Sequence, residues 1–476
     1  MVQGAVRQRI HWLAVHGVVR GMSKFFARRG DPQGRLLVDP LVRADPVPFT
    51  EELRARGPIV KCRAVYMTVD HKVANDLLRS DDFRVFGLGT NLPKPVQWVA
   101  DRTKPNLIHP IQPPSMLSVE APDHTRYRKL VSSVFTTRAV AALRDRVQET
   151  ANTLLDGLAD DAGTVDVVDR YCSQLPVTVI GDILGVPDEA RPKILEFGEL
   201  GAPSLDIGLT WRQYRTVCSG IEGFSAWLSN HLHELRRHPG DDLMSQIILA
   251  SEGAEGGPLT HRELLSTAGL VLAAGFETTV NLLGNGIRML FETPAHLATL
   301  AARPELWPTA VEEILRLDSP VQLSARIAAK DTDIEGTLVR RGVGIIIYLA
   351  GANRDPKVFP DPHRFDIERE NAGKHLSFSG GRHFCLGAAL ARAEGEVGRG
   401  RSSNAFPMPG WQVAAAGSTP GCCGDGHRCR SRSAGRVPRS VRSAGVTRDE
   451  RSLPLEKSPK YRVVRNVRGE RTPVGS

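Results

Sequence analysis

The stretch Phe378-Ser-Gly-Gly-Arg-His-Phe-Cys-Leu-Gly387 places one thiol, that of Cys385, among three glycines. Good helix formers follow directly from Ala388 to Glu394, so the thiol is predicted to lie on a tight loop at the N-terminus of a helix. Glycines allow the backbone to turn with positive φ and to approach a flat ligand closely. The first amides of the helix, together with Arg382 and His383, favour the thiolate, which nucleophiles and metal ligands require. The loop therefore predicts a reactive or metal-binding thiol.

Seven cysteines are scattered through the 476 residues, and none forms a C-x-x-C pair. Zinc-ribbon and thioredoxin-type sites are therefore excluded. A chain of this length needs no disulfide framework, and its N-terminus does not look like a cleavable signal peptide. We therefore expect a reducing, cytoplasmic location.

The N-terminal segment, residues 1–35, is basic and contains a short apolar run. Trp12 to Val15 and Val18 to Val19 lie among six Lys and Arg side chains of residues 7–29. The run is too short to span a bilayer, so no transmembrane segment is expected. A helix that is docked against the rest of the protein or frayed is the simpler interpretation. A basic amphipathic helix lying on a membrane surface is the alternative.

Charge is concentrated after residue 398. The segment 399–476 carries 16 Lys plus Arg against 5 Asp plus Glu, whereas the first 398 residues carry 46 against 48. This tail is rich in Arg, Ser, Gly and Pro and has only three aromatic rings that could stack on bases, those of Phe406, Trp411 and Tyr461. We therefore expect no nucleic-acid partner and interpret the tail as a disordered, solvated segment without clear helical or strand period.

Residues 36–398 are predicted to form a single large domain, mainly α with a small β component. No linker divides this region, and no internal repeat is visible. Apolar periodicity predicts helices over 70–79, 124–135, 138–158, 178–184, 189–197, 212–235 and 262–291. Strand signals are confined to 59–69 and 325–349.

One predicted helix carries a buried acid. Only two residues from Leu264 to Leu290 are charged, and one of them is Glu277. An unpaired buried carboxylate is costly, so Glu277 is a functional candidate. Thr278 lies four residues after Ala274, whose carbonyl its hydroxyl can bond, and Gly275 removes bulk beside it. The pattern predicts a locally opened helix with a proton relay through water; a satisfied core glutamate is the alternative.

Four further cationic or donor side chains could hold an anion near the thiol. His124 and Arg128 lie four residues apart on one predicted helix, and Arg326 and His383 come from later segments. Gathered around one loop, these four side chains could bind two carboxylates of a buried group.

The loop at 378–387, the Ala274-Gly275-x-Glu277-Thr278-Thr279 segment and the Glu313-x-x-Arg316 pair together resemble the cytochrome P450 family. The resemblance runs from about residue 36 to 398, and the segments 121–128, 239–243 and 375–378 are similar to the soluble bacterial class. Ser379 stands where the family commonly has glycine. The resemblance implies the cytochrome P450 fold, a single helical domain around a buried haem b.

The resemblance also implies roles for individual residues. Cys385 would be the axial thiolate ligand of the haem iron. Glu277 and Thr278 would deliver protons to dioxygen. The other residues that the resemblance implies at the cofactor are the loop residues Phe378, Gly381 and Gly387, the propionate-binding residues His124, Arg128, Arg326 and His383, and Ala274 and Gly275, which make room beside the haem. Glu313, Arg316 and Arg364 would form a structural ion network before the loop.

The implied activity is a monooxygenase that inserts one oxygen atom of O2 into an apolar small molecule. The family lines its pocket with segments that correspond here to 85–116, 197–218 and 321–324 and to residues near Phe276. Electrons would come from NAD(P)H through a separate ferredoxin reductase and ferredoxin, because the chain has no G-x-G-x-x-G unit. The basic residues Arg126, Lys129, Arg382 and Arg392 form either a docking surface for the ferredoxin or a solvated basic face.

The tail departs from the family pattern, which continues with further apolar turns and short strands. An altered reading frame or a replaced segment near residue 398 explains the abrupt change, and a disordered regulatory tail is the milder interpretation. The alternative function is therefore a non-catalytic haem or ligand binder, or an inactive product of a frame-altered monooxygenase gene. A cysteine-nucleophile hydrolase is a third class, and it predicts no haem.

Overall fold

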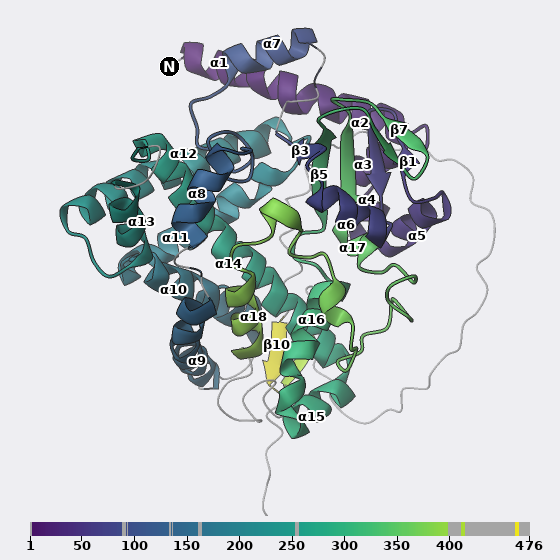
Figure 1. Cartoon of the computed structure of the whole chain (residues 1–476). Coiled ribbons are helices and arrows are strands. Elements are labelled where there is room, and N and C mark those ends of the chain that lie inside the picture. Colours follow the sequence, from purple (N-terminus) through teal and green to yellow (C-terminus); the bar gives the residue numbers. More distant parts are fainter. Residues whose placement is uncertain are drawn as a thin grey trace, which may run out of the picture.

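Helices dominate the computed structural model, which describes residues 2–87, 92, 94–132, 135, 137–159, 164–252, 257–397, 411–414 and 462–465 (Figure 1). The main helical body contains α8 (Asp123–Ser132), α9 (Thr137–Ala159), α10 (Gln174–Ile183), α11 (Arg191–Gly201), α12 (Trp211–Arg237), α13 (Leu243–Glu252), α14 (His261–Glu292), α15 (Pro294–Ala302), α16 (Trp307–Leu317) and α18 (Ala388–Val397). The remaining α-helices are α1 (Val2–Trp12), α2 (Val18–Ala27), α3 (Pro32–Val38), α4 (Pro40–Ala44), α5 (Val47–Ala55), α6 (His71–Arg79), α7 (Lys94–Thr103) and α17 (Leu349–Ala352). This architecture confirms the predicted mainly α fold class.

A five-stranded sheet forms the small β component. Its strand order is β1 (Val60–Lys61), β2 (Val65–Thr68), β8 (Gly344–Tyr348), β5 (Leu323–Ala328) and β3 (Phe83–Val85). β2 and β8 pair in parallel, with Val65 opposite Gly344, and the other pairs are antiparallel. Ile345 and Ile347 of β8 are fully buried on one face of the sheet, whereas Ile346 on the other face is partly buried. A separate hairpin joins β6 (Thr332–Ile334) and β7 (Thr337–Val339).

The long helix α14 runs through the helical body (Figure 1). A capping box starts it: Glu263 N donates to Thr260 Oγ1 at 3.3 Å, and Thr260 N donates to Glu263 Oε2 at 2.8 Å. Its apolar side chains join the largest core cluster, with Leu264, Ala268 and Leu272 almost completely buried. The helix therefore forms the rigid centre against which α10, α12, α16 and α18 pack.

The N-terminal helix is docked on the protein, as the simpler interpretation of the sequence predicted. α1 and α2 are one continuous helix through the π-helical turn η1 (Leu13–Gly17), and α7 lies along its first part (Figure 1). Trp12 Nε1 donates to the carbonyl oxygen of Leu209 at 2.9 Å, and Arg20 Nη1 donates to that of Gly208 at 3.1 Å. Among the described residues, no helix has the length and hydropathy of a membrane span.

Two short strands lie in the segment after residue 398, where the sequence shows no strand period. β9 (Trp411–Ala414) and β10 (Arg462–Arg465) pair antiparallel, and β10 also pairs with β4 (Thr164–Asp166). The prediction of a tail without strands was therefore wrong at these residues. Four-residue strands are too short for an apolar alternation to stand out in the sequence. The rest of the tail prediction lies outside the described residues.

Candidate functional site

The Cys385 loop has the tight turn that its glycines predicted. Gly381 has φ of +62°, and a Cβ at this residue would lie 2.7 Å from the carbonyl oxygen of Leu78. Only glycine fits both requirements. Ser379 also has a positive φ, +61°, which is a strained conformation for a residue with a Cβ. The backbone amide of Cys385 donates to the carbonyl oxygen of Phe378 at 2.9 Å, which fixes the thiol at the start of α18.

The thiol of Cys385 is exposed, although protein surrounds it deeply enough for burial to raise its pKa. The amide of Gly387 and the charges of Arg128 and Arg392 lower this pKa and offset only part of the effect. In the protein alone, burial outweighs the helix-end amides, and a cation bound at the sulfur would favour the thiolate that the sequence predicts.

α14 remains α-helical without a break where the sequence predicts a locally opened helix, so that part of the prediction was wrong. The burial of the helix does change there: Ala273 and Ala274 are exposed, whereas residues 264–272 before them are buried. The hydroxyl of Thr278 donates to the carbonyl oxygen of Ala274 at 2.8 Å, as the sequence predicted. Gly275 faces α10 and not the exposed side of α14, because a Cβ at this position would lie 2.9 Å from Ile180 of α10. Gly275 thus allows α14 and α10 to pack closely.

Glu277 is partly buried on α14, and its pKa is raised by burial and then by the nearby carboxylate of Glu199 on α11. The two helices meet one residue earlier, where a Cβ at Gly198 would lie 2.0 Å from the ring of Phe276. A carboxyl group with a raised pKa is a stronger proton acceptor than an ordinary glutamate, as a proton relay requires. Phe276 itself is buried in this contact, with 3% of its surface exposed, and lines no open space.

Four donor side chains gather near the Cys385 loop. The rings of His124 and His383 lie with centroids 4.2 Å apart, and the charges of Arg128 and Arg326 both act on His383. Burial and these cations lower the pKa of His383 to about 3, and burial lowers that of Arg326 to about 10. The structure therefore brings together all four residues that the sequence singled out as binding a buried anion.

Three nitrogen atoms of these donors lack acceptors within the described part of the chain. His124 Nε2, His383 Nε2 and Arg326 Nη2 are buried without a hydrogen-bond partner there. The nearest carboxylate is that of Glu120, whose Oε2 lies 3.9 Å from His383 Nε2 and accepts a hydrogen bond from Arg382 at 3.2 Å. Buried donors without acceptors are costly, so the cluster fits a bound group that brings its own carboxylates.

A buried ion network supports the loop, with one partner different from the prediction. Arg316 Nε donates to Glu313 Oε2 at 2.6 Å, and both side chains are fully buried. Arg369 Nε donates to the other oxygen, Glu313 Oε1, at 3.1 Å. The side chain of Arg364, predicted to join this network, is 66% exposed and pairs with Asp366. Only the carbonyl oxygen of Arg364 takes part, so Arg369 replaces it as the second cation.

Glu394 is a buried acid that the sequence analysis missed. It lies on α18 with 1% of its surface exposed, and the side chain of Thr279 on α14 hydrogen-bonds to it. Burial raises the pKa of Glu394 to about 8. No local pattern in the sequence marks it, because its burial depends on the contact between α18 and α14.

Most of the basic residues proposed as a ferredoxin docking surface are already paired. Arg126 binds Glu263, Arg382 binds Asp81 and Glu120, and Arg392 binds Glu312. The guanidinium of Arg392 also lies over the ring of Phe378, 4.5 Å from its centroid. Lys129 is exposed on α8. Three of these four residues therefore stabilise the fold and are not simply a solvated basic face.

Comparison with known proteins identifies the family. The family model described as Cytochrome P450 matches residues 300–398, which include the Cys385 loop. The curated cytochrome P450 140 of Mycobacterium tuberculosis is 62% identical over 414 residues, which are 87% of this chain and 94% of that protein. The chain belongs to the cytochrome P450 family.

Two further P450 proteins extend the comparison. Cytochrome P450 monooxygenase PikC of Streptomyces venezuelae is 37% identical over 74% of this chain and 82% of its own length. The solved structure of P450BioI in complex with hexadec-9Z-enoic acid ligated acyl carrier protein has a TM-score of 0.71 and 32% identity, and covers 78% of this chain and 94% of that chain. The protein is thus a haem-thiolate oxidoreductase of the P450 monooxygenase type.

The residues present fit a P450 haem. A cation bound at the sulfur favours the ionised form of the Cys385 thiol. The buried nitrogen atoms of His124, Arg326 and His383 that have no partner among the described residues match the propionates that a haem carries. The exposed residues Ala273 and Ala274 mark the stretch of α14 at which side chains leave space.

Proposed function

We propose that this P450 inserts one oxygen atom of O2 into an apolar small molecule, with a haem b held by Cys385 in the domain formed by residues 36–398. One observation carries the proposal: four donor side chains, three of them with a buried nitrogen atom that has no partner among the described residues, gather beside an exposed thiol at the start of α18. An anionic, iron-containing flat group satisfies both features, whereas a cysteine hydrolase needs neither.

The haem supplies the activation of dioxygen when it is bound. His124, Arg128, Arg326 and His383 bind its propionates and fix its orientation. Gly381 lets the loop approach closely, and Gly387 leaves space beside the thiol, because a Cβ there would meet no described protein atom within 4 Å. Phe378, 8% exposed beneath Arg392, shields the sulfur from water.

Glu277 and Thr278 move protons in this proposal. Burial and the nearby carboxylate of Glu199 raise the pKa of Glu277, so its carboxyl holds a proton more readily than an exposed glutamate. The hydroxyl of Thr278 donates to the carbonyl oxygen of Ala274, which leaves its own oxygen free to accept a hydrogen bond from water and so to position that water. Together they pass protons along α14 toward the space beside Ala274.

The apolar character of the substrate rests on exposed side chains near the site. Val321 and Leu323, 43% and 38% exposed, precede and begin the strand β5 that also carries Arg326. With Ala273 and Ala274 they offer apolar surface, which favours an apolar ligand. The fatty acyl group of the P450BioI complex supports this substrate class.

Electrons come, in this proposal, from NAD(P)H through a ferredoxin reductase and a ferredoxin in the cytoplasm. The absence of a G-x-G-x-x-G unit from the sequence supports separate carriers. Of the four basic residues predicted to dock the ferredoxin, Lys129 alone has no ion pair with another described residue. The exposed face of α8 that carries Lys129 is therefore the first surface to test for ferredoxin binding.

The alternative is a haem binder without turnover, and the segment after residue 398 favours it, because the family match ends there. The carbon monoxide difference spectrum of the reduced, purified protein tests the thiolate first. A strongly red-shifted Soret band is expected, and its absence would overturn the proposal. Oxidation of a medium-chain fatty acid or steroid with ferredoxin, reductase and NADPH then separates the enzyme from the binder. An intact spectrum without turnover of any apolar compound favours the binder.

A further inference from the structure

The N-terminal helix exposes a row of large apolar side chains. Val6, Ile10 and Leu13 are 53%, 43% and 55% exposed. Their spacing of four and three residues places them on one face of the helix. The opposite side, which contains His11 and Val15, is buried against the protein. Five of the 14 exposed large apolar side chains of the described residues lie between positions 6 and 25, so the exposure is concentrated here.

The π-helical turn η1 extends this row into α2. A π-helix holds more residues per turn than an α-helix, so it changes the face on which the following residues lie. With five residues in η1, Ser23 remains on the buried side, and Phe25 returns to the side that carries Ile10 and Leu13. Phe25 is 49% exposed and Met22 is 43% exposed. The row therefore extends over 20 residues, from position 6 to position 25.

A neighbouring helix adds an indole to the same region. Trp98 on α7 is 59% exposed, and the guanidinium of Arg102 lies 4.6 Å from the centroid of its ring. The guanidinium of Arg29 lies 4.0 Å from the ring centroid of Phe25. α7 contacts α1, and Figure 1 shows the two helices side by side. Aromatic rings paired with cations are typical of side chains at the boundary between lipid and water.

The charge of this region has one sign. Residues 1–30 contain no Asp or Glu and carry six basic side chains: Arg7, Arg9, Arg20, Lys24, Arg28 and Arg29. Lys24, Arg28 and Arg29 are exposed beside Phe25. A protein partner buries few charges in the core of its interface, whereas a membrane with anionic lipids attracts basic side chains and accepts apolar ones.

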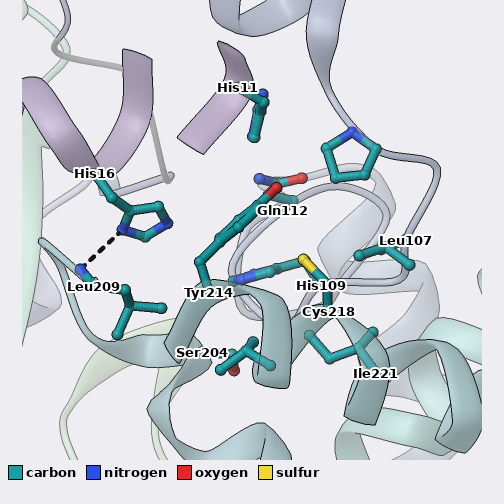
Figure 2. A pocket seen from close by; sticks show the side chains of 12 residues that line it. His11, His16, Leu107, His109, Gln112, Ser204, Leu209, Tyr214, Cys218 and Ile221 are labelled. Carbon is teal, nitrogen blue, oxygen red and sulfur yellow. Dashed lines mark hydrogen bonds between the residues drawn. The ribbon is translucent and has the colours of Figure 1, made fainter. Parts of the chain in front are cut away.

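The helix is held in place before it meets any partner. Besides the bonds from Trp12 and Arg20, His16 Nδ1 accepts from the amide of Leu209 at 3.4 Å, and burial lowers the pKa of His16 to about 4, so it stays neutral. His11 and His16 lie beside Tyr214 of α12 around a small cavity (Figure 2). The cavity has a volume of about 20 Å³, enough for about one water. The surface is therefore preformed and does not have to fold on binding.

We propose that this N-terminal surface, formed by Val6, Ile10, Leu13, Met22, Phe25 and Trp98 with the basic residues around them, docks the protein onto a membrane that contains anionic lipids. The helix lies in the membrane surface and does not cross it. The inference is independent of the haem chemistry, since the surface consists of residues outside the Cys385 site.

Vesicle sedimentation tests the proposal with the purified holoprotein. Binding to equimolar phosphatidylglycerol and phosphatidylcholine vesicles is expected, with weak binding to pure phosphatidylcholine and a loss on raising the salt concentration. Ile10→Glu/Leu13→Glu is expected to weaken binding about tenfold or more, because both side chains would leave the lipid. The matched control Leu249→Glu/Leu338→Glu changes two side chains that are 54% and 47% exposed elsewhere, and binding should not change.

Three outcomes would overturn the docking proposal. No binding to anionic vesicles at low salt would do so directly. Unchanged binding of Ile10→Glu/Leu13→Glu would assign the interaction to the basic tail. A dimer in light scattering that the same double variant abolishes, without vesicle binding, would assign the surface to a second copy of the chain. An unchanged haem spectrum in each variant verifies that the fold is intact.

Discussion

The imidazole rings of His124 and His383 lie with centroids 4.2 Å apart, and each has a buried Nε2 atom without a hydrogen-bond partner among the described residues. The rings come from α8 and from the loop before α18, more than 250 residues apart in sequence. Two unpaired donors at this separation, with Arg326 close enough to lower the pKa of His383, are a costly arrangement in a protein without a bound anion.

Arg326→Leu is therefore expected to affect the protein in opposite ways with and without haem. In the haem-free protein, the change removes a buried cation with an unpaired nitrogen, so stability is unchanged or rises. Haem affinity falls, because one propionate loses its partner. Thermal unfolding of both forms and the rate of haem transfer to apomyoglobin measure the two effects. Arg340→Leu, at an exposed ion pair with Asp331, is the control and should change neither. A less stable haem-free Arg326→Leu protein with unchanged haem transfer would contradict this assignment.

Ser379→Gly is expected to stabilise the protein by about 0.5–1 kcal/mol. The positive φ of Ser379 costs about 1–2 kcal/mol, and the extra freedom of glycine in the unfolded chain removes about half of that gain. Urea unfolding measures the difference. Gly381→Ser makes the reverse change at a neighbouring left-handed residue and should destabilise more strongly, because Leu78 leaves no room for a Cβ. Equal effects of the two variants would show that φ is not the cause.

Glu394→Gln is expected to remove a pH dependence of stability. Burial raises the pKa of Glu394 to about 8, above its ordinary value of 4.5, so the folded protein keeps a proton that the unfolded chain loses between these values. The free energy of unfolding of the wild type therefore falls as pH rises from about 4.5 to 8. Glutamine carries no such proton. The difference in free energy of unfolding between Glu394→Gln and the wild type should therefore shift in favour of the variant across this range, as measured by urea titrations at pH 5, 6.5 and 8. Glu292→Gln, at a carboxylate that is 60% exposed, should show no such growth.

Arg369→Met and Arg364→Met should differ strongly, although the two arginines are five residues apart. Loss of Arg369 leaves the buried carboxylate of Glu313 with one cation fewer, which costs about 3–5 kcal/mol. Loss of the exposed Arg364 side chain costs about 0–1 kcal/mol. Chemical unfolding ranks the two, and a reversed ranking would restore the assignment made from the sequence.

Thr278→Ala is expected to uncouple electron consumption from product formation. The variant loses the hydroxyl bonded to the carbonyl oxygen of Ala274, so protons reach the site less directly. NADPH consumption should continue while hydrogen peroxide release rises and product falls. Thr278→Ser keeps a hydroxyl and serves as the control, with coupling close to wild type. Unchanged coupling in the alanine variant would remove Thr278 from the proton path.

The parts of the site that the sequence predicted are those that local patterns determine. The long apolar run predicted 262–291, and α14 spans His261 to Glu292. The four-residue spacing of Ala274 and Thr278 determined their hydrogen bond, and the glycines of the Cys385 loop determined its turn. Helical geometry and φ preferences act over a few residues, so no tertiary information was needed.

The parts that the sequence missed depend on which way a side chain turns. Arg364 and Arg369 lie in the same Pro-rich loop, and only the fold determines which guanidinium enters the core. The ion pairs of Arg126 and Arg382 join residues far apart in sequence. Glu394 lies among good helix formers, a pattern that is typical of an exposed helical turn. Only the contact with α14 shows that Glu394 is buried.

The Glu313 network also limits how early α16 can complete its packing while the protein is being synthesised. The buried guanidinium of Arg316 needs the carbonyl oxygens of Asn353, Pro362 and Arg364, which are 37 to 48 residues later in the chain, and Glu313 needs Arg369, 56 residues later. While the ribosome is still making this stretch, α16 cannot bury its charges. The helix therefore takes its final place only when translation has nearly reached Cys385, which makes the haem ligand one of the last parts of the domain to find its surroundings.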